Sequence, residues 1–152
     1  MWPFSLLGIG QKTPPKRRSV TFEFEKTSSD LFSEIYRPLA TVKLWSESSK
    51  SWKKVTMIVD TGADYTIIPR YIATWVGIDE DKKAQKYTNL GLGGEETVYF
   101  LPDVKVKIGP FERQVPIGII NSTKVPPLLG RQLMLNDFEV LLKQHTVTFS
   151  AP

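Results

Sequence analysis

The residues best suited to chemistry are an acid, a hydroxyl and a glycine in the run Asp60-Thr61-Gly62, with a second acid at Asp64. Apolar segments rich in β-branched residues flank this run on both sides, which is typical of buried strands. We therefore expect Asp60 at the end of a strand in the core. A carboxylate there is costly unless it is hydrogen-bonded or shares a proton, and this makes the run a candidate for acid–base chemistry.

Composition limits the other kinds of chemistry. The chain has 152 residues, which suits one domain with a sizeable core. It has no cysteine, which excludes disulfides, thiol catalysis and cysteine metal sites. His145 is its single histidine, so a histidine-rich metal site is impossible and a Ser-His-Asp triad would have to use this residue. We expect no metal and no cofactor.

The charge distribution separates an N-terminal tail from one domain, and we expect a tail over residues 1–18 and a domain over residues 19–152. The net charge is +4, and a basic cluster lies at Lys12, Lys16, Arg17 and Arg18. The rest is nearly balanced, which argues against a nucleic-acid partner. No apolar run approaches the ~20 residues of a membrane span, and we expect a cytoplasmic protein. An alternative for the tail is a membrane or partner anchor that inserts Trp2, Phe4 and Leu7.

The patterning around the candidate run predicts a mainly β domain. Strands are predicted over residues 20–24, 39–45, 52–59, 66–68, 104–108, 114–120, 138–142 and 146–149. Helical turns are predicted over residues 31–36, 69–76 and 132–136, the second beginning at Pro69, placing Tyr71, Ile72 and Trp75 on one face and ending at Gly77. Roughly nine short strands and two short helices favour a small barrel-like fold.

A glycine-rich segment, Gly91-Leu92-Gly93-Gly94, lies between two strand-like arms at residues 86–90 and 95–100. Two such arms around glycines predict a hairpin with a mobile tip. A phosphate-binding loop is the competing interpretation. It fails because no helix follows the glycines and no Lys-Ser/Thr pair completes a phosphate cradle.

In Asp60-Thr61-Gly62-Ala63-Asp64 the sequence resembles the retropepsin family of aspartic proteases. The glycine-rich hairpin about 30 residues downstream extends the resemblance. So does Leu128-Leu129-Gly130-Arg131, about 70 residues downstream, which is similar to the family's second element of two aliphatic residues and a glycine. The resemblance covers residues 35–149, and the helix at 69–76 is more like cellular and bacterial members than viral ones.

The resemblance implies a small closed β-barrel in which each half of the active site supplies one Asp-Thr-Gly. This chain has only one, so a two-aspartate site implies a homodimer with Asp60 of each copy on the twofold axis. As in aspartic proteases generally, the paired carboxylates would share one proton, activate a water and protonate the scissile carbonyl. The implied function is an aspartic endopeptidase acting on extended peptides or proteins under a glycine-rich flap.

The resemblance also assigns roles to individual residues. Asp64 and Arg131 are expected to form a buried ion pair that fixes the active-site loop. Residues 20–24 and 146–149 are expected to meet in a sheet between subunits, the last strand having unpaired backbone groups. The assigned sets are catalytic Asp60, Thr61 and Gly62; substrate-binding Ala63, Asp64, Gly91, Leu92, Gly93, Gly94 and Ile119; and structural Leu129, Gly130 and Arg131.

Two alternatives remain beside an endopeptidase that acts on other proteins. A catalytically silent homodimer with this fold would bind an extended segment without cleaving it. A protease acting on its own tail would cleave within residues 11–20, which would be a reachable cleavage segment. Without the later elements, Asp60 would be read as an acid in an ordinary turn, since Asp-Thr-Gly is common there.

Overall fold

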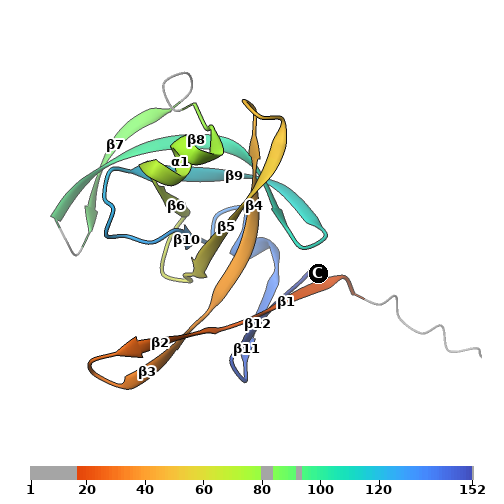
Figure 1. The fold of residues 1–152 in the computed structure, drawn as a ribbon. Coiled ribbons are helices and arrows are strands. Elements are labelled where there is room, and N and C mark those ends of the chain that lie inside the picture. The colour runs from red at the N-terminus through yellow and green to blue at the C-terminus, as the bar shows by residue number, and fades with distance from the viewer. Residues whose placement is uncertain (1–16, 80–83, 92–93, 152) are drawn as a thin grey trace, which may run out of the picture.

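The computed structural model describes residues 17–79, 84–91 and 94–151 (Figure 1). Most of the predicted tail, and the predicted hairpin residues Leu92 and Gly93, lie outside these ranges. Arg17 and Arg18, assigned to the tail from the sequence, contact the domain: Arg17 pairs with Glu139 at 2.7 Å, and the Arg18 carbonyl accepts a hydrogen bond from Ala151.

The described chain is mostly β-strand, as predicted. The strands and helices are β1 (Ser19–Glu23), β2 (Glu25–Ser29), β3 (Ser33–Arg37), β4 (Leu39–Ser46), β5 (Ser51–Val59), β6 (Thr66–Pro69), α1 (Arg70–Val76), β7 (Gln85–Gly91), β8 (Gly94–Ile108), β9 (Phe111–Ile120), β10 (Leu128–Leu129), the 3₁₀ helix η1 (Leu135–Asp137), β11 (Glu139–Lys143) and β12 (Thr146–Ser150).

The main sheet contains seven strands in the order β4-β5-β10-β6-β9-β8-β7. β4 also pairs with β8, with Val42 opposite Ile108. The hydrogen bonding between strands therefore leads from β8 back to β4, the first strand of the sheet. Along β4 every second side chain is buried, as the alternating sequence predicts. The side chains on the inner face lie in one core cluster, where Leu44, Met57 and Ile117 are among the largest fully buried residues.

A three-stranded sheet has the order β1-β12-β11 and packs Val147 and Phe149 into the same core. The predicted pairing of residues 20–24 with 146–149 is present within one chain. The prediction that the last strand has unpaired backbone groups is wrong. β12 is central and pairs with β1 on one side and β11 on the other, because a tight turn at Gln144 and His145 folds β11 back onto it. The edges of this sheet are β1 and β11.

β2 and β3 form a separate hairpin that projects from the body of the molecule (Figure 1). A helical turn was predicted over residues 31–36, and this prediction is wrong. Ser33 has a φ of 63°, which turns the chain into β3, and Ile35 then pairs with Thr27 across the hairpin. At its base the Tyr36 ring stacks on His145, with centroids 3.9 Å apart.

α1 follows β6 directly and ends where the sequence predicts. Pro69 is the N-cap, and Gly77 caps the C-terminus with φ 81° while donating to the carbonyls of Ala73 and Thr74. Of the three residues predicted on one face, Ile72 packs against the core, whereas Tyr71 and Trp75 are more than half exposed. The fully buried residues of the helix are Ala73 and Val76. Within the described ranges, no helix has the length and apolarity needed to cross a membrane.

Candidate active site

The candidate site is built where β5 and β6 are joined by residues 60–65. These two strands are not neighbours, because the short strand β10 lies between them. β10 runs parallel to β5, with Leu129 opposite Val59, and antiparallel to β6, with Leu128 opposite Ile67. The loop that begins at Asp60 therefore crosses the end of β10, and its first amide donates to the Leu129 carbonyl at 3.0 Å.

The Asp60 carboxylate is oriented by its own loop. The Gly62 amide donates to Asp60 Oδ1 at 2.9 Å, and the Ala63 amide donates to the Asp60 carbonyl at 3.2 Å. Asp60 is half-buried, whereas Thr61 and Gly62 are exposed. Asp60 is therefore less buried than its position after a buried strand predicts. In a single chain its carboxylate is partly open to solvent, and the hydrogen bond from Gly62 fixes its orientation.

The segment after β10 supports the loop along its length. The Arg131 amide donates to the Ala63 carbonyl at 3.0 Å, and the Gln132 amide donates to the Asp64 carbonyl at 2.8 Å. The Gly130 amide donates to Thr66 Oγ1, which is buried, at 3.2 Å. The residues assigned as structural support thus lie directly against the residues assigned to catalysis.

Gly130 has no room for a side chain. A Cβ atom at this position would lie 2.2 Å from the backbone carbon and oxygen of Tyr65 and 2.7 Å from the Thr66 nitrogen. Contacts this short do not occur between non-bonded atoms, so the close approach of the two segments requires glycine. This gives a steric reason for the glycine that follows two aliphatic residues.

Asp64 and Arg131 form the predicted ion pair, with Arg131 Nη2 donating to Asp64 Oδ1. The expectation of a buried pair is wrong for the single chain, because the two side chains are 73% and 44% exposed. An exposed pair contributes about 0–1 kcal/mol. The loop geometry in one chain therefore depends mainly on the backbone hydrogen bonds.

Replacing Arg131 by alanine is expected to lower the free energy of unfolding of the isolated chain by no more than about 1 kcal/mol, since the pair is exposed. Urea denaturation at several protein concentrations measures this. A loss of several kcal/mol that grows with protein concentration would show that association buries the pair. A large loss at every concentration would contradict the structural account.

The helix predicted over residues 132–136 is shorter than expected. Leu133 has a φ of 53°, which interrupts a helical path, and only η1 follows. Met134 and Leu135 are nevertheless buried in the core, and the Leu135 amide donates to the Gly130 carbonyl at 3.3 Å. This short segment anchors the support of the loop to the core.

The predicted glycine-rich hairpin is present as β7 and β8, with Gly91 opposite Gly94 and Gln85 opposite Phe100. Gly94 has a φ of 105°, a conformation that favours glycine. β8 then continues beside β9 in the main sheet. Of the assigned substrate-binding residues, Ile119 lies apart from the loop: it is fully buried in the core and pairs with Ile68.

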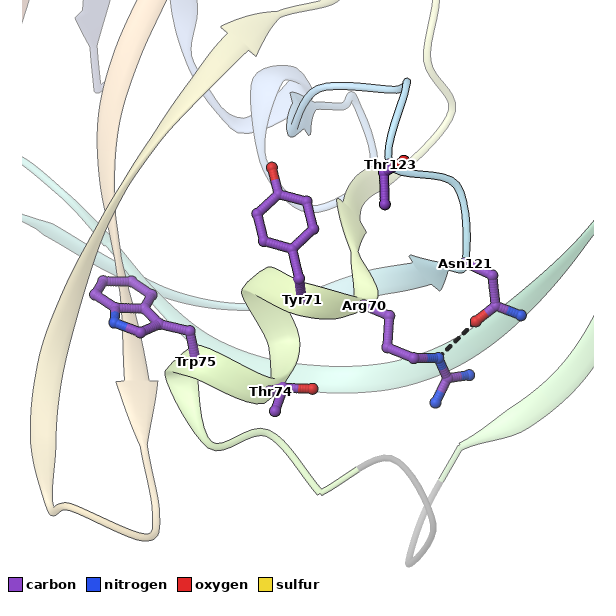
Figure 2. Close-up of a pocket in the computed structure, with 6 residues that line it drawn as sticks. All are labelled: Arg70, Tyr71, Thr74, Trp75, Asn121 and Thr123. Carbon is purple, nitrogen blue, oxygen red and sulfur yellow. Dashed lines mark hydrogen bonds between the residues drawn. The ribbon is translucent and has the colours of Figure 1, made fainter.

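Surface hollows elsewhere do not involve the candidate site. The hollow in Figure 2 lies along α1 and contains the exposed rings of Tyr71 and Trp75. Beside it, Arg70 Nε donates to Asn121 Oδ1 at 2.6 Å (Figure 2). None of the residues assigned to catalysis or substrate binding lines this hollow. In the part of the chain that the structure describes, no group of three acidic, histidine or cysteine side chains is arranged to hold a metal ion.

Sequence reasoning missed Tyr65, which follows Asp64 and packs its ring over Gly118. A methyl group at residue 118 would lie 2.6 Å from the Tyr65 ring. The available signal was a glycine inside an otherwise apolar strand, which often marks a close approach by another group. The pairing partner could not be found from the sequence, because it lies far away along the chain.

The Asp60 loop thus lies against β10 and against Gly130, which follows β10 in the chain. The family model described as aspartyl protease matches residues 48–133, which is more than half of the chain, and the chain belongs to this family. The matched residues include the Asp60 loop, the β7–β8 hairpin and Gly130.

The fold is retropepsin-like. A crystal structure of a retropepsin-like aspartic protease from Rickettsia conorii matches with a TM-score of 0.59 and 19% sequence identity. The match covers 90% of this chain and 96% of that chain. No protein among those with curated descriptions matches significantly.

Proposed function

We propose that the chain is an aspartic endopeptidase whose active site joins Asp60 from each of two copies. The observation that carries the proposal is the half-buried, hydrogen-bonded carboxylate of Asp60 in a chain of the aspartyl protease family that has a single Asp-Thr-Gly. One carboxylate cannot be both general base and general acid in the same step. A second copy of the same loop supplies the missing group and gives the site twofold symmetry.

The proposed chemistry uses one shared proton. Two carboxylates a few Å apart hold a single proton between them, because ionising both is costly. The charged carboxylate takes a proton from a water, and the resulting hydroxide attacks the scissile carbonyl carbon. The neutral carboxylic acid gives its proton to the carbonyl oxygen. The carboxyl group that took the proton from water then gives it to the leaving nitrogen, while the other carboxylate takes a proton back from a hydroxyl of the tetrahedral intermediate. The intermediate collapses, the peptide bond breaks, and the pair again holds one proton.

The surroundings of the loop fit an extended peptide. Asp64 is exposed beside the catalytic loop, and Ala63 is half-buried within it. The β7–β8 hairpin, with Gly91, Leu92, Gly93 and Gly94 at its end, is proposed as a flap that covers the substrate and pairs with its backbone. The ladder that returns from β8 to β4 supports a small barrel as the scaffold.

Peptide hydrolysis by the purified protein tests the proposal. A peptide library incubated between acidic and neutral pH should give new amino termini with wild type and none with the Asp60→Asn variant. Equal cleavage by both proteins would refute an aspartic mechanism at Asp60. Binding of peptides without cleavage by wild type would instead support a silent binding module with the same fold.

A further inference from the structure

The sheet formed by β8 and β9 has a second apolar face in addition to the one in the core. Side chains alternate between the two faces of a sheet. Ile119 belongs to the main core cluster, whereas Val98 and its cross-strand partner Ile120 are 2% and 4% exposed and lie outside that cluster. The pair Phe100 and Gly118 lies on the same face as Val98 and Ile120. Some group outside the core must therefore cover this face.

Tyr65 is that group. Its ring lies over Gly118, where a Cβ atom would be 2.6 Å from Tyr65 Cε2 and 2.8 Å from Val98 Cγ1. It meets Phe100 edge-on, with ring centroids 5.4 Å apart and an interplanar angle of 86°. Phe100 in turn meets Tyr87 edge-on at 6.0 Å. A series of three rings thus runs from the Asp60 loop to the outer strand of the hairpin.

The Tyr65 backbone is fixed as firmly as its ring. The residue follows Asp64 and precedes β6, and its carbon and oxygen lie against Gly130 too closely for any side chain there. On its two sides, the carbonyl of Asp64 and the hydroxyl of Thr66 accept hydrogen bonds from the supporting segment. Because the Tyr65 backbone is constrained, the position of its ring follows the position of the Asp60 loop. The residues that contact the ring are therefore coupled to that loop.

We propose that Tyr65 is a positioning residue that couples the Asp60 loop to the β7–β8 hairpin through Phe100 and Tyr87. The ring contacts fix the position of the β7–β8 hairpin relative to the Asp60 loop and limit spontaneous opening of the hairpin. The consequence for catalysis rests on the proposed function, in which this hairpin covers the substrate. The coupling itself is a property of the free protein and is measured without any substrate.

The test is amide hydrogen exchange on the full chain, comparing wild type with Tyr65→Leu and Tyr65→Phe. Loss of the ring should speed exchange in residues 85–91 and 94–100 about three- to tenfold, the range expected when one or two edge-on aromatic contacts are lost. Phenylalanine keeps the ring contacts, so exchange in Tyr65→Phe should stay slower than in Tyr65→Leu. Where the protein cleaves peptide, Tyr65→Leu should raise KM several-fold and leave kcat within about twofold.

The matched control is Trp52→Leu, which removes an edge-on aromatic pair with Trp45 on the β4–β5 hairpin, at 5.3 Å. It should speed exchange there and leave residues 85–91 unchanged. Unchanged exchange in the β7–β8 hairpin of Tyr65→Leu would overturn the proposal, as would an equal increase over the whole chain.

Gly118→Ala gives a second test that retains the tyrosine. The added methyl group cannot share space with the ring, so it should displace Tyr65 and speed exchange in the same hairpin. Hairpin exchange equal to that of wild type in this variant would also overturn the proposal. A wild-type protein that cleaves no peptide would refute the proposed function and leave the exchange result intact.

Discussion

A Gly130→Ala variant is expected to lose most of its folding stability, by about 3 kcal/mol or more, the range of the most disruptive single substitutions. The methyl group would lie 2.2 Å from the carbon and oxygen of Tyr65. Neither segment can move aside, because Arg131 and Gln132 hold the loop by backbone hydrogen bonds and Leu129 lies in the core. Thermal unfolding followed by circular dichroism measures the loss.

Gly94→Ala is the matched control for this prediction. Gly94 has a conformation that favours glycine, with φ at 105°, but among the described residues no atom beyond its chain neighbours lies within 4 Å of a Cβ built there. Alanine at residue 94 should therefore cost only backbone strain, about 1 kcal/mol. Equal stability of wild type and Gly130→Ala would show that the two segments do not approach as the structure describes.

The Asp60→Asn variant is expected to lose peptide cleavage by about a thousandfold or more, since general acid and general base steps each contribute 10²–10⁴-fold. An amide cannot accept a proton from water in this step. Asparagine has the same shape and its oxygen can still accept the Gly62 amide, so the midpoint of urea unfolding should stay close to that of wild type. Initial rates and denaturation curves on the same preparations check both parts.

Asp103→Asn serves as the matched control for charge. Asp103 is exposed at the irregular part of β8 and is not followed by a threonine and glycine. Its rate should equal that of wild type. Loss of activity in both variants would point to a general effect of removing an acid and would argue against a specific role of Asp60.

Much of the scaffold could be predicted because alternating apolar and polar residues mark the strands that bury one face. β4 and β12 alternate buried and partly buried side chains, as their alternating sequences predict. Separate strands were predicted over residues 95–100 and 104–108, whereas in the structure the single strand β8 spans both and passes Pro102 with a register shift between Leu101 and Val104. β2 and β3 were missed because they bury no side chain fully and so have no apolar period to detect.

The parts of the candidate site whose residues are close together in the sequence could be predicted. Contacts between segments far apart in the sequence were harder to predict. The run from Asp60 to Asp64 and the glycine at residue 130 are visible in the sequence, and the structure brings them into contact. The exposure of the Asp64–Arg131 pair depends on how the whole surface folds. The packing of the Tyr65 ring on Gly118 depends on the register between β8 and β9, which no local sequence pattern encodes.

Mixing wild type with the Asp60→Asn variant tests most directly whether Asp60 is half of a shared site. The two proteins are combined in varied ratios at constant total concentration, left to exchange subunits, and assayed for peptide cleavage. If each site needs Asp60 from two copies, activity should follow the square of the wild-type fraction and fall to about one quarter in an equal mixture. Activity proportional to the wild-type fraction, about one half in that mixture, would contradict the account.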